Sequence, residues 1–176
     1  KPGKYVRTRN FNLNQWAAWN FGGDRLYSGA NVNSHWTFTN YYSIGGGLNV
    51  DAAPFRDRVT RGGPGVLGNP GKSLWYYANT DNRKALSFYY NGDFGGDRFN
   101  TMRRGFSPGF NWRATSSMSL NMSVRYSINK DDSQWVENID QGNGAKRYVF
   151  GRIDQKTLSI NTRFNYTLSP NLSLQV

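Results

Sequence analysis

The stretch SMSLNMSVRYSIN, residues 117–129, alternates between polar and apolar side chains without a break. Serine, asparagine and arginine occupy the polar positions, and the apolar positions are Met118, Leu120, Met122, Val124, Tyr126 and Ile128. Successive side chains of a β-strand point to opposite faces of the sheet. The alternation therefore predicts a strand with one apolar face and one polar face.

The same pattern extends over most of the chain. Residues 157–168 (TLSINTRFNYTL) repeat it with only Thr162 softening the apolar face, and weaker versions occupy residues 11–21, 26–38, 42–50 and 86–94. About nine strands are expected, and no stretch has helical periodicity. We therefore predict an all-β fold, an antiparallel up-and-down transmembrane β-barrel of the outer-membrane type, with residues 1–176 as a single barrel domain or part of one.

The predicted connections alternate in length. Tight turns are expected at residues 39–42, 80–84, 114–117 and 169–171, whereas longer segments are expected at 53–72, 95–108 and 129–146. Short turns at one end and long loops at the other are typical of outer-membrane barrels. The connection at residues 22–25 would be the one short segment at the long-loop end.

The pentapeptide FGGDR occurs twice, at Phe21–Arg25 and at Phe94–Arg98. Four predicted strands separate the copies, so an up-and-down arrangement places both at the same end of the sheet. Each phenylalanine continues the apolar face of its strand. We expect each Gly-Gly-Asp to turn the chain away from the sheet with backbone angles that glycine tolerates.

Alternation alone fits a soluble barrel with its apolar face inward equally well. The best strands run to about 12 residues, close to the roughly 9–11 that cross a bilayer and longer than the soluble mode of about 5–6. The polar face carries serine, threonine, asparagine and arginine, which suits a hydrated interior. We therefore expect the polar face to line a lumen, with three inward basic side chains on adjacent strands: Arg113, Arg125 and Arg163.

Aromatic side chains gather beside the predicted turns. Two girdles at the membrane–water interfaces are typical of such barrels. The predicted girdle consists of Trp19, Phe21, Trp36, Phe38, Phe94, Trp112 and Tyr166. The alternative is a soluble all-β carbohydrate-binding module that uses surface tryptophan, tyrosine and asparagine.

Charge and composition exclude several other functions. The net charge of +11 comes from basic residues scattered along the 176-residue chain, which argues against a nucleic-acid partner. The chain has no cysteine and one histidine, His35, without an evident acidic partner in the sequence, so we predict no metal site, no cofactor and no catalytic residue. The expected partners are the lipid bilayer or lipopolysaccharide, together with other segments or subunits that complete the barrel.

Three further motifs carry a resemblance. They are the Gly-Gly-Pro loop at residues 62–64, the DNRK turn at residues 81–84, and DQKTLS followed by NYTLSPNLSLQ near the C-terminal end. From about residue 50 to 176 the chain resembles the C-terminal barrel region of a bacterial outer-membrane family of unknown function. That family carries an N-terminal carbohydrate-binding module of the family-nine-like type.

The resemblance implies an outer-membrane location and a barrel with more strands than are present here. It brings no catalytic residues. Single-chain bacterial barrels close with an even number of strands, so the odd number expected here indicates a fragment. The last predicted strand stops at Val176 within its alternating pattern, which favours the same interpretation.

Overall fold

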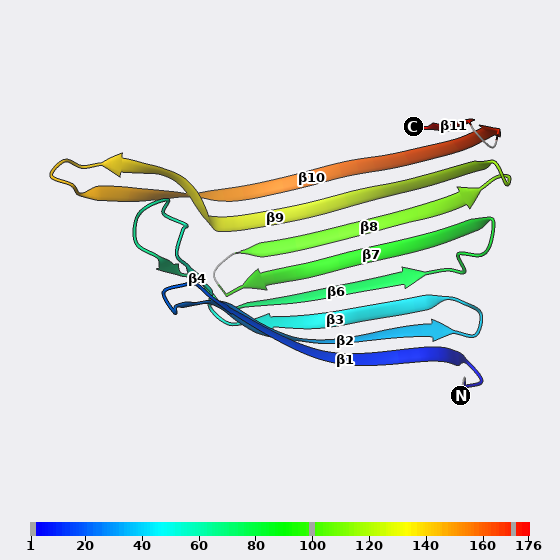
Figure 1. The fold of residues 1–176 in the computed structure, drawn as a ribbon, viewed down its shortest axis with the longest axis horizontal. Coiled ribbons are helices and arrows are strands. Elements are labelled where there is room, and N and C mark those ends of the chain that lie inside the picture. Colours follow the sequence, from blue (N-terminus) through cyan, green and yellow to red (C-terminus); the bar gives the residue numbers. More distant parts are fainter. Residues whose placement is uncertain (1–2, 99–100, 170–171) are drawn as a thin grey trace.

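The computed structural model describes residues 3–98, 101–169 and 172–176. Strands and their connections make up this part of the chain, in which no helix is long and apolar enough to cross a membrane. The strands are β1 (Val6–Trp19), β2 (Arg25–Phe38), β3 (Ser43–Asp51), β4 (Phe55–Arg56), β5 (Val66–Leu67), β6 (Gly71–Asn79), β7 (Leu86–Asp97), β8 (Met102–Arg113), β9 (Met118–Asp140), β10 (Lys146–Ser169) and β11 (Leu172–Gln175) (Figure 1).

The main sheet has nine strands in the order β1-β2-β3-β6-β7-β8-β9-β10-β11, and every neighbouring pair is antiparallel. Strands β4 and β5 form a separate two-stranded sheet. The predicted all-β, antiparallel, up-and-down arrangement is confirmed. Strands β1 and β11 lie at opposite edges and do not pair with each other, so the described residues form an open sheet and no closed barrel (Figure 1).

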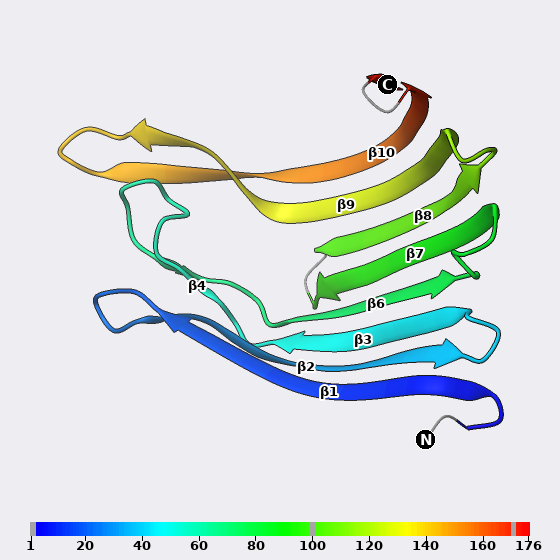
Figure 2. The ribbon, with the colours of Figure 1, turned by 45° about the vertical axis from the view of Figure 1, so that its right-hand side comes forward.

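The strand register sorts the side chains into two continuous faces. Leu13 is paired with Val32, Val32 with Leu48, Leu48 with Leu74, and Leu74 with Phe94, so these five side chains share one face. The next residue along each strand belongs to the opposite face. We call the two faces the apolar face and the polar face, and the sheet that carries them is curved (Figure 2).

Two expected loops are strands instead. Residues 95–108 were predicted as a long connection, but β7 continues to Asp97 and β8 begins at Met102. Residues 129–146 belong mostly to β9 and β10, which extend beyond the rest of the sheet as a two-stranded hairpin with its turn near Gly142 (Figure 1). Both loop predictions were wrong. A polar segment can form a strand when a neighbouring strand pairs with its backbone, and polar composition alone does not reveal such pairing.

The two FGGDR copies lie at the same end of the sheet, as expected, but differ in conformation. In the first copy Gly23 has a φ of 87° and closes the turn between β1 and β2. In the second copy Gly95 and Gly96 stay inside β7, paired with both β6 and β8. The expectation of a turn with unusual glycine angles is therefore wrong for the second copy, because two partner strands hold its backbone extended.

The connection between β3 and β6, residues 52–70, packs against the extended β9–β10 hairpin. Asn138 Nδ2 donates to the backbone oxygen of Thr60 at 2.8 Å, and an Arg56 guanidinium nitrogen donates to Ser133 Oγ at 2.9 Å. The guanidinium of Arg61 lies 3.9 Å from the ring centroid of Trp135. The connection thus reaches the end of the sheet that β9 and β10 extend (Figure 2).

Candidate functional site

The described residues have no buried hydrophobic core, and their burial is inverted relative to a water-soluble protein. Asn31 and Ser87 on the polar face are only 6% and 4% exposed, whereas Phe11 and Leu13 on the apolar face are 74% and 77% exposed. Soluble domains usually bury leucine and phenylalanine and expose asparagine. The polar face is therefore the candidate functional surface, because its side chains are the ones that the fold organises.

A ladder of asparagine side chains crosses the first strands of this face. Asn14 Nδ2 donates to Asn31 Oδ1 at 3.2 Å, and Asn31 Nδ2 donates to Asn49 Oδ1 at 2.6 Å. Asn49 Nδ2 continues the ladder to Ser73 Oγ at 2.9 Å. Asn33 Nδ2 also donates to Asn31 Oδ1. An amide has both donors and an acceptor, so neighbouring asparagines on paired strands satisfy one another and leave further donors and acceptors for water or solutes.

Aromatic rings lie beside this ladder and extend over glycines of the neighbouring strand. The rings of Trp75 and Tyr77 are parallel to within 7°, with centroids 6.4 Å apart. A side chain at Gly47 would collide with Trp75, and one at Gly45 would collide with Tyr77. Because Gly45 and Gly47 have no side chains, the rings of Trp75 and Tyr77 on β6 can lie over β3 and reach toward β2.

The lone histidine belongs to this aromatic group. His35 Nδ1 lies 2.9 Å from the Tyr77 hydroxyl oxygen, and its ring centroid is 5.5 Å from that of Trp75. Among the described residues no group of histidine, cysteine or carboxylate side chains has the arrangement needed to hold a metal ion. His35 thus has an aromatic hydroxyl as its hydrogen-bond partner.

We predict that Gly47→Ala disturbs the aromatic group. The added methyl carbon would stand 2.8 Å from Trp75 Nε1 and from Asn33 Cβ, so the indole must move. We expect a shifted Trp75 fluorescence and a loss of about 1–3 kcal/mol in unfolding free energy, as is typical of overpacking. Gly71→Ala is the control on β6, because its methyl would meet nothing closer than 3.6 Å. Equal effects of the two substitutions would contradict the prediction.

The three predicted inward arginines lie on the polar face of adjacent strands β8, β9 and β10, but at different heights. Arg125 Nη2 forms an ion pair with Asp93 Oδ1 at 2.7 Å, beside Gly105. Arg113 donates to the backbone oxygen of Lys84 at 3.0 Å, so it holds the turn between β6 and β7 in place. Arg163 is exposed, and no described residue gives its side chain a hydrogen bond or ion pair. The structure does not gather the three into one cluster.

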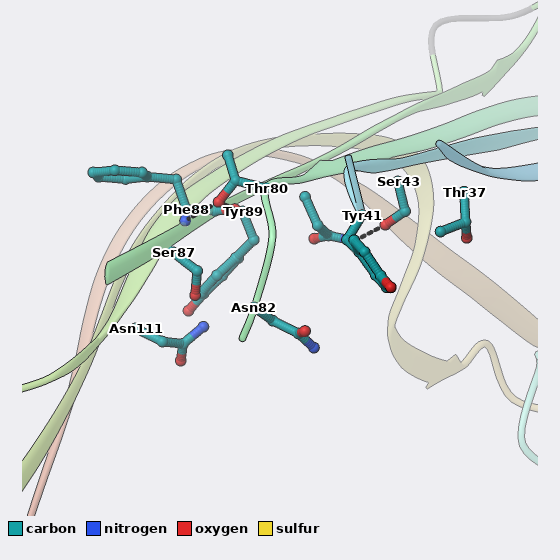
Figure 3. A pocket seen from close by; sticks show the side chains of 10 residues that line it. Thr37, Tyr41, Ser43, Thr80, Asn82, Ser87, Phe88, Tyr89 and Asn111 are labelled. Atoms are coloured by element: carbon teal, nitrogen blue, oxygen red, sulfur yellow. Dashed lines mark hydrogen bonds between the residues drawn. The ribbon is translucent and has the colours of Figure 1, made fainter. Parts of the chain in front are cut away.

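A hollow of about 460 Å³ lies on the polar face near the short turns. Figure 3 shows Ser87, Tyr89 and Asn111 on one side of the strands and Phe88 on the other, as the alternation requires. Nine of its ten lining residues carry a hydroxyl or an amide group, and Phe88 is the tenth. Its lining includes Tyr41, Asn79, Asn82, Ser87, Tyr89 and Asn111.

Two short turns meet beside this hollow. The Arg83 side chain donates to both carboxylate oxygens of Asp81, at 2.9 and 2.8 Å, and its guanidinium lies 3.1 Å from the ring centroid of Tyr41. The Arg83 hydrogen bonds lower the pKa of the Asp81 carboxyl from 3.8 to about 2. This contact links the β2–β3 turn to the β6–β7 turn. It explains part of the DNRK motif, which the sequence marked only as a turn.

The lowered pKa gives a testable pH dependence. Because the folded pKa of Asp81 lies below its ordinary value, the contribution of the pair is complete above about pH 4 and is lost as the pH falls through about 2. We expect the Asp81 carboxyl to titrate near 2 by NMR in the wild type, and at a clearly higher pH, toward the ordinary value of 3.8, in Arg83→Gln. Identical titration in both proteins would exclude the pair as the cause.

The predicted girdle residues lie at both ends of the sheet. Trp36, Phe38, Trp112 and Tyr166 are on the apolar face near the short turns, where Trp36 is paired with Ile44 and Trp112 with Leu120. Trp19 and Phe94 lie toward the other end. Phe94 packs edge-on against Phe106, with centroids 5.4 Å apart. Phe21 lies in the turn after β1 and is fully exposed, so it does not continue the strand as expected.

The contact between residues 52–70 and the β9–β10 hairpin was not predicted. Arg61 and Trp135, which form part of this contact, lie in two segments that were predicted as loops. Alternation describes single strands, so it does not indicate which side chains distant in sequence come into contact. Thr60 is 1% exposed, although it lies in a connection, and its Oγ1 donates to the backbone oxygen of Pro64 at 2.8 Å. The Gly-Gly-Pro motif therefore belongs to an ordered connection.

The sheet and its polar face define an open, antiparallel β-meander with inverted burial. A family model described as "Domain of unknown function (DUF5916)" matches residues 1–176, and the chain belongs to that family. No curated protein and no solved structure matches the chain significantly.

Proposed function

We propose that this chain forms part of an integral bacterial outer-membrane β-barrel, a non-catalytic pore or scaffold. The carrying observation is the inverted burial: the described residues contain no buried hydrophobic side chain, while Leu158 and Ile160 on the apolar face are 66% and 61% exposed. In water such a face would be unstable, whereas lipid acyl chains would keep its apolar side chains out of water.

The unpaired edges support the barrel. β1 pairs only with β2, and most of β10 pairs only with β9, so long rows of backbone groups at both edges have no strand partner among the described residues. Unpaired backbone groups are expensive in hydrocarbon, so membrane strands form closed barrels. We propose that strands from other segments or subunits complete the barrel and that the polar face lines its interior.

The polar face would determine the hydrogen-bonding groups and the charge of the barrel interior. Asparagine, serine and tyrosine offer neutral donors and acceptors, and Arg163 adds a positive charge without an ion-pair partner among the described residues. An interior with more free cations than anions would favour anions if it conducts. No metal or cofactor is part of this proposal.

Site-directed labelling tests the proposal, because the chain contains no cysteine of its own. Leu158→Cys and Ser159→Cys are neighbours on opposite faces of β10. In liposomes we expect Leu158→Cys to react with a lipid-soluble maleimide and not with a charged one, and Ser159→Cys to show the reverse. Flotation with the liposomes and heat-modifiable gel migration would accompany this pattern.

The same experiment distinguishes the soluble alternative. A carbohydrate-binding module that uses Trp75, Tyr77 and the asparagines would remain monomeric without detergent, would not float with liposomes, and would expose both cysteines to the charged reagent. That result would overturn the membrane proposal.

A further inference from the structure

The apolar face carries a row of positive charges near the end of the sheet where β1 turns into β2 and where β6 and β8 begin. Register places Lys72 of β6 opposite Val50, Arg104 of β8 opposite Phe94, Lys130 of β9 opposite Met102, and Lys156 of β10 opposite Ile128. All four side chains thus share a face with leucine, valine and phenylalanine. We call Lys72, Arg104, Lys130 and Lys156 the cationic row.

Two members of the row frame a shallow groove. Lys72 and Arg104 lie on the two strands that flank β7, and Lys72 is level with Met102, two residues from Arg104. Ordinary strand geometry places their backbone positions about 12 Å apart. The groove measures about 290 Å³, and its lining includes Leu48, Leu74, Phe94 and Met102 together with both cations. Gly96 of β7 is paired with Lys72 and has no side chain, whereas Phe94, two residues earlier on the same face, is paired with Arg104 and forms part of the groove.

The cations that frame the groove have no partner within the described chain. Lys72 and Arg104 are exposed, and no described residue gives either side chain a hydrogen bond or ion pair. Lys130 differs, because its Nζ lies 3.1 Å from Asp154 Oδ2. Free cations beside an apolar surface are costly in hydrocarbon unless an anion accompanies them.

We infer that Lys72 and Arg104 bind the phosphate of an anionic membrane lipid, whose acyl chains lie along Leu48, Leu74 and Phe94. This inference rests on the proposed function, since it takes the apolar face to be the lipid-facing one. Charge and shape agree: a phosphorylated amphiphile presents its anion beside an apolar tail, and the groove presents cations beside apolar side chains. The end of the apolar face that carries the cationic row would then lie at the headgroup level of the leaflet that contains this lipid.

The test compares lipid binding to the detergent-solubilised protein by native mass spectrometry. The probes are bis-phosphorylated lipid A, the same lipid after dephosphorylation, and inorganic phosphate. We expect Lys72→Gln/Arg104→Gln to bind the phosphorylated lipid roughly thirtyfold more weakly, from two cations near an anionic headgroup. Wild-type protein should bind the dephosphorylated lipid equally weakly, and millimolar inorganic phosphate should not displace the lipid.

The matched control is Lys146→Gln/Arg147→Gln, which removes the same charge from exposed positions at the tip of the β9–β10 hairpin. It should bind the phosphorylated lipid as wild type does. Equal binding by wild type and Lys72→Gln/Arg104→Gln would overturn the inference, and so would an equal loss in the control.

Failure of the membrane proposal gives a different result. If the wild-type protein does not float with neutral phosphatidylcholine vesicles, both proposals fail. If wild type and both double variants float equally but show no preference for the phosphorylated lipid, only the lipid site fails. The single variants Lys72→Gln and Arg104→Gln, each expected to lose about fivefold, keep the test open if the double variant does not fold.

Discussion

Leu158→Arg/Ile160→Arg is expected to abolish insertion into liposomes. Both side chains are more than half exposed on the apolar face of β10, where Leu158 is paired with Tyr126 and Ile160 with Val124. Arginine on the lipid face of a transmembrane barrel costs about 2–4 kcal/mol at the bilayer midplane. Two such residues would cost about 4–8 kcal/mol, which is comparable to the lower part of the roughly 5–15 kcal/mol that stabilises an ordinary domain.

The control places the same charges on the other face of the same strand. Thr157→Arg/Asn161→Arg adds two arginines on the polar face, where Thr157 is paired with Ser127 and Asn161 with Ser123. We expect this variant to insert as wild type does, measured by flotation and by heat-modifiable migration. Loss of insertion in both variants, or in neither, would contradict the assignment of the two faces.

Asn31→Ala is expected to give the largest loss of stability from a single truncation on the polar face. Asn31 is 6% exposed and accepts from Asn14 and Asn33, while its Nδ2 donates to Asn49 Oδ1 and, at 3.3 Å, to the backbone oxygen of Leu48. The alanine leaves several of these groups without a partner in a crowded position. Each unsatisfied buried polar group costs about 1–3 kcal/mol, so we expect about 2–4 kcal/mol overall.

Urea unfolding in detergent would measure this loss. Asn161→Ala serves as the control, since Asn161 also lies on the polar face but is exposed, and its side chain makes no hydrogen bond with any described residue. The control should change the unfolding free energy by less than about 0.5 kcal/mol. If Asn31→Ala lowers the unfolding free energy no more than the control does, the asparagine side chains do not stabilise the protein. The hydrogen bonds between the strand backbones would then be sufficient.

Much of the sheet could be predicted from local pattern. The division of Met118–Ile128 into an apolar and a polar row needed only the period of two, and the register of β9 with β8 and β10 then carried both rows across the sheet. The short turns at residues 39–42 and 80–84 were also predictable, because polar turn residues separate segments that alternate between apolar and polar side chains.

The organisation of the polar face could not be predicted in the same way. The sequence marked Arg125 as inward, but only the fold sets it against Asp93, 32 residues away. The parallel rings of Trp75 and Tyr77 depend on Gly47 and Gly45 of another strand, and no local pattern relates those positions. Cross-strand contacts follow from register, which is fixed by the whole set of pairings.

The sequence by itself determined that this chain forms long antiparallel strands with one apolar and one polar face, because alternation is a property of each strand alone. Only the tertiary structure decided that one FGGDR copy turns while the other remains extended, since Gly95 and Gly96 have partner strands on both sides and Gly23 has none. The tertiary structure also decided that side chains of the polar face are the buried ones. The burial of a side chain depends on the residues that the neighbouring strands place beside it, and these residues are distant in sequence.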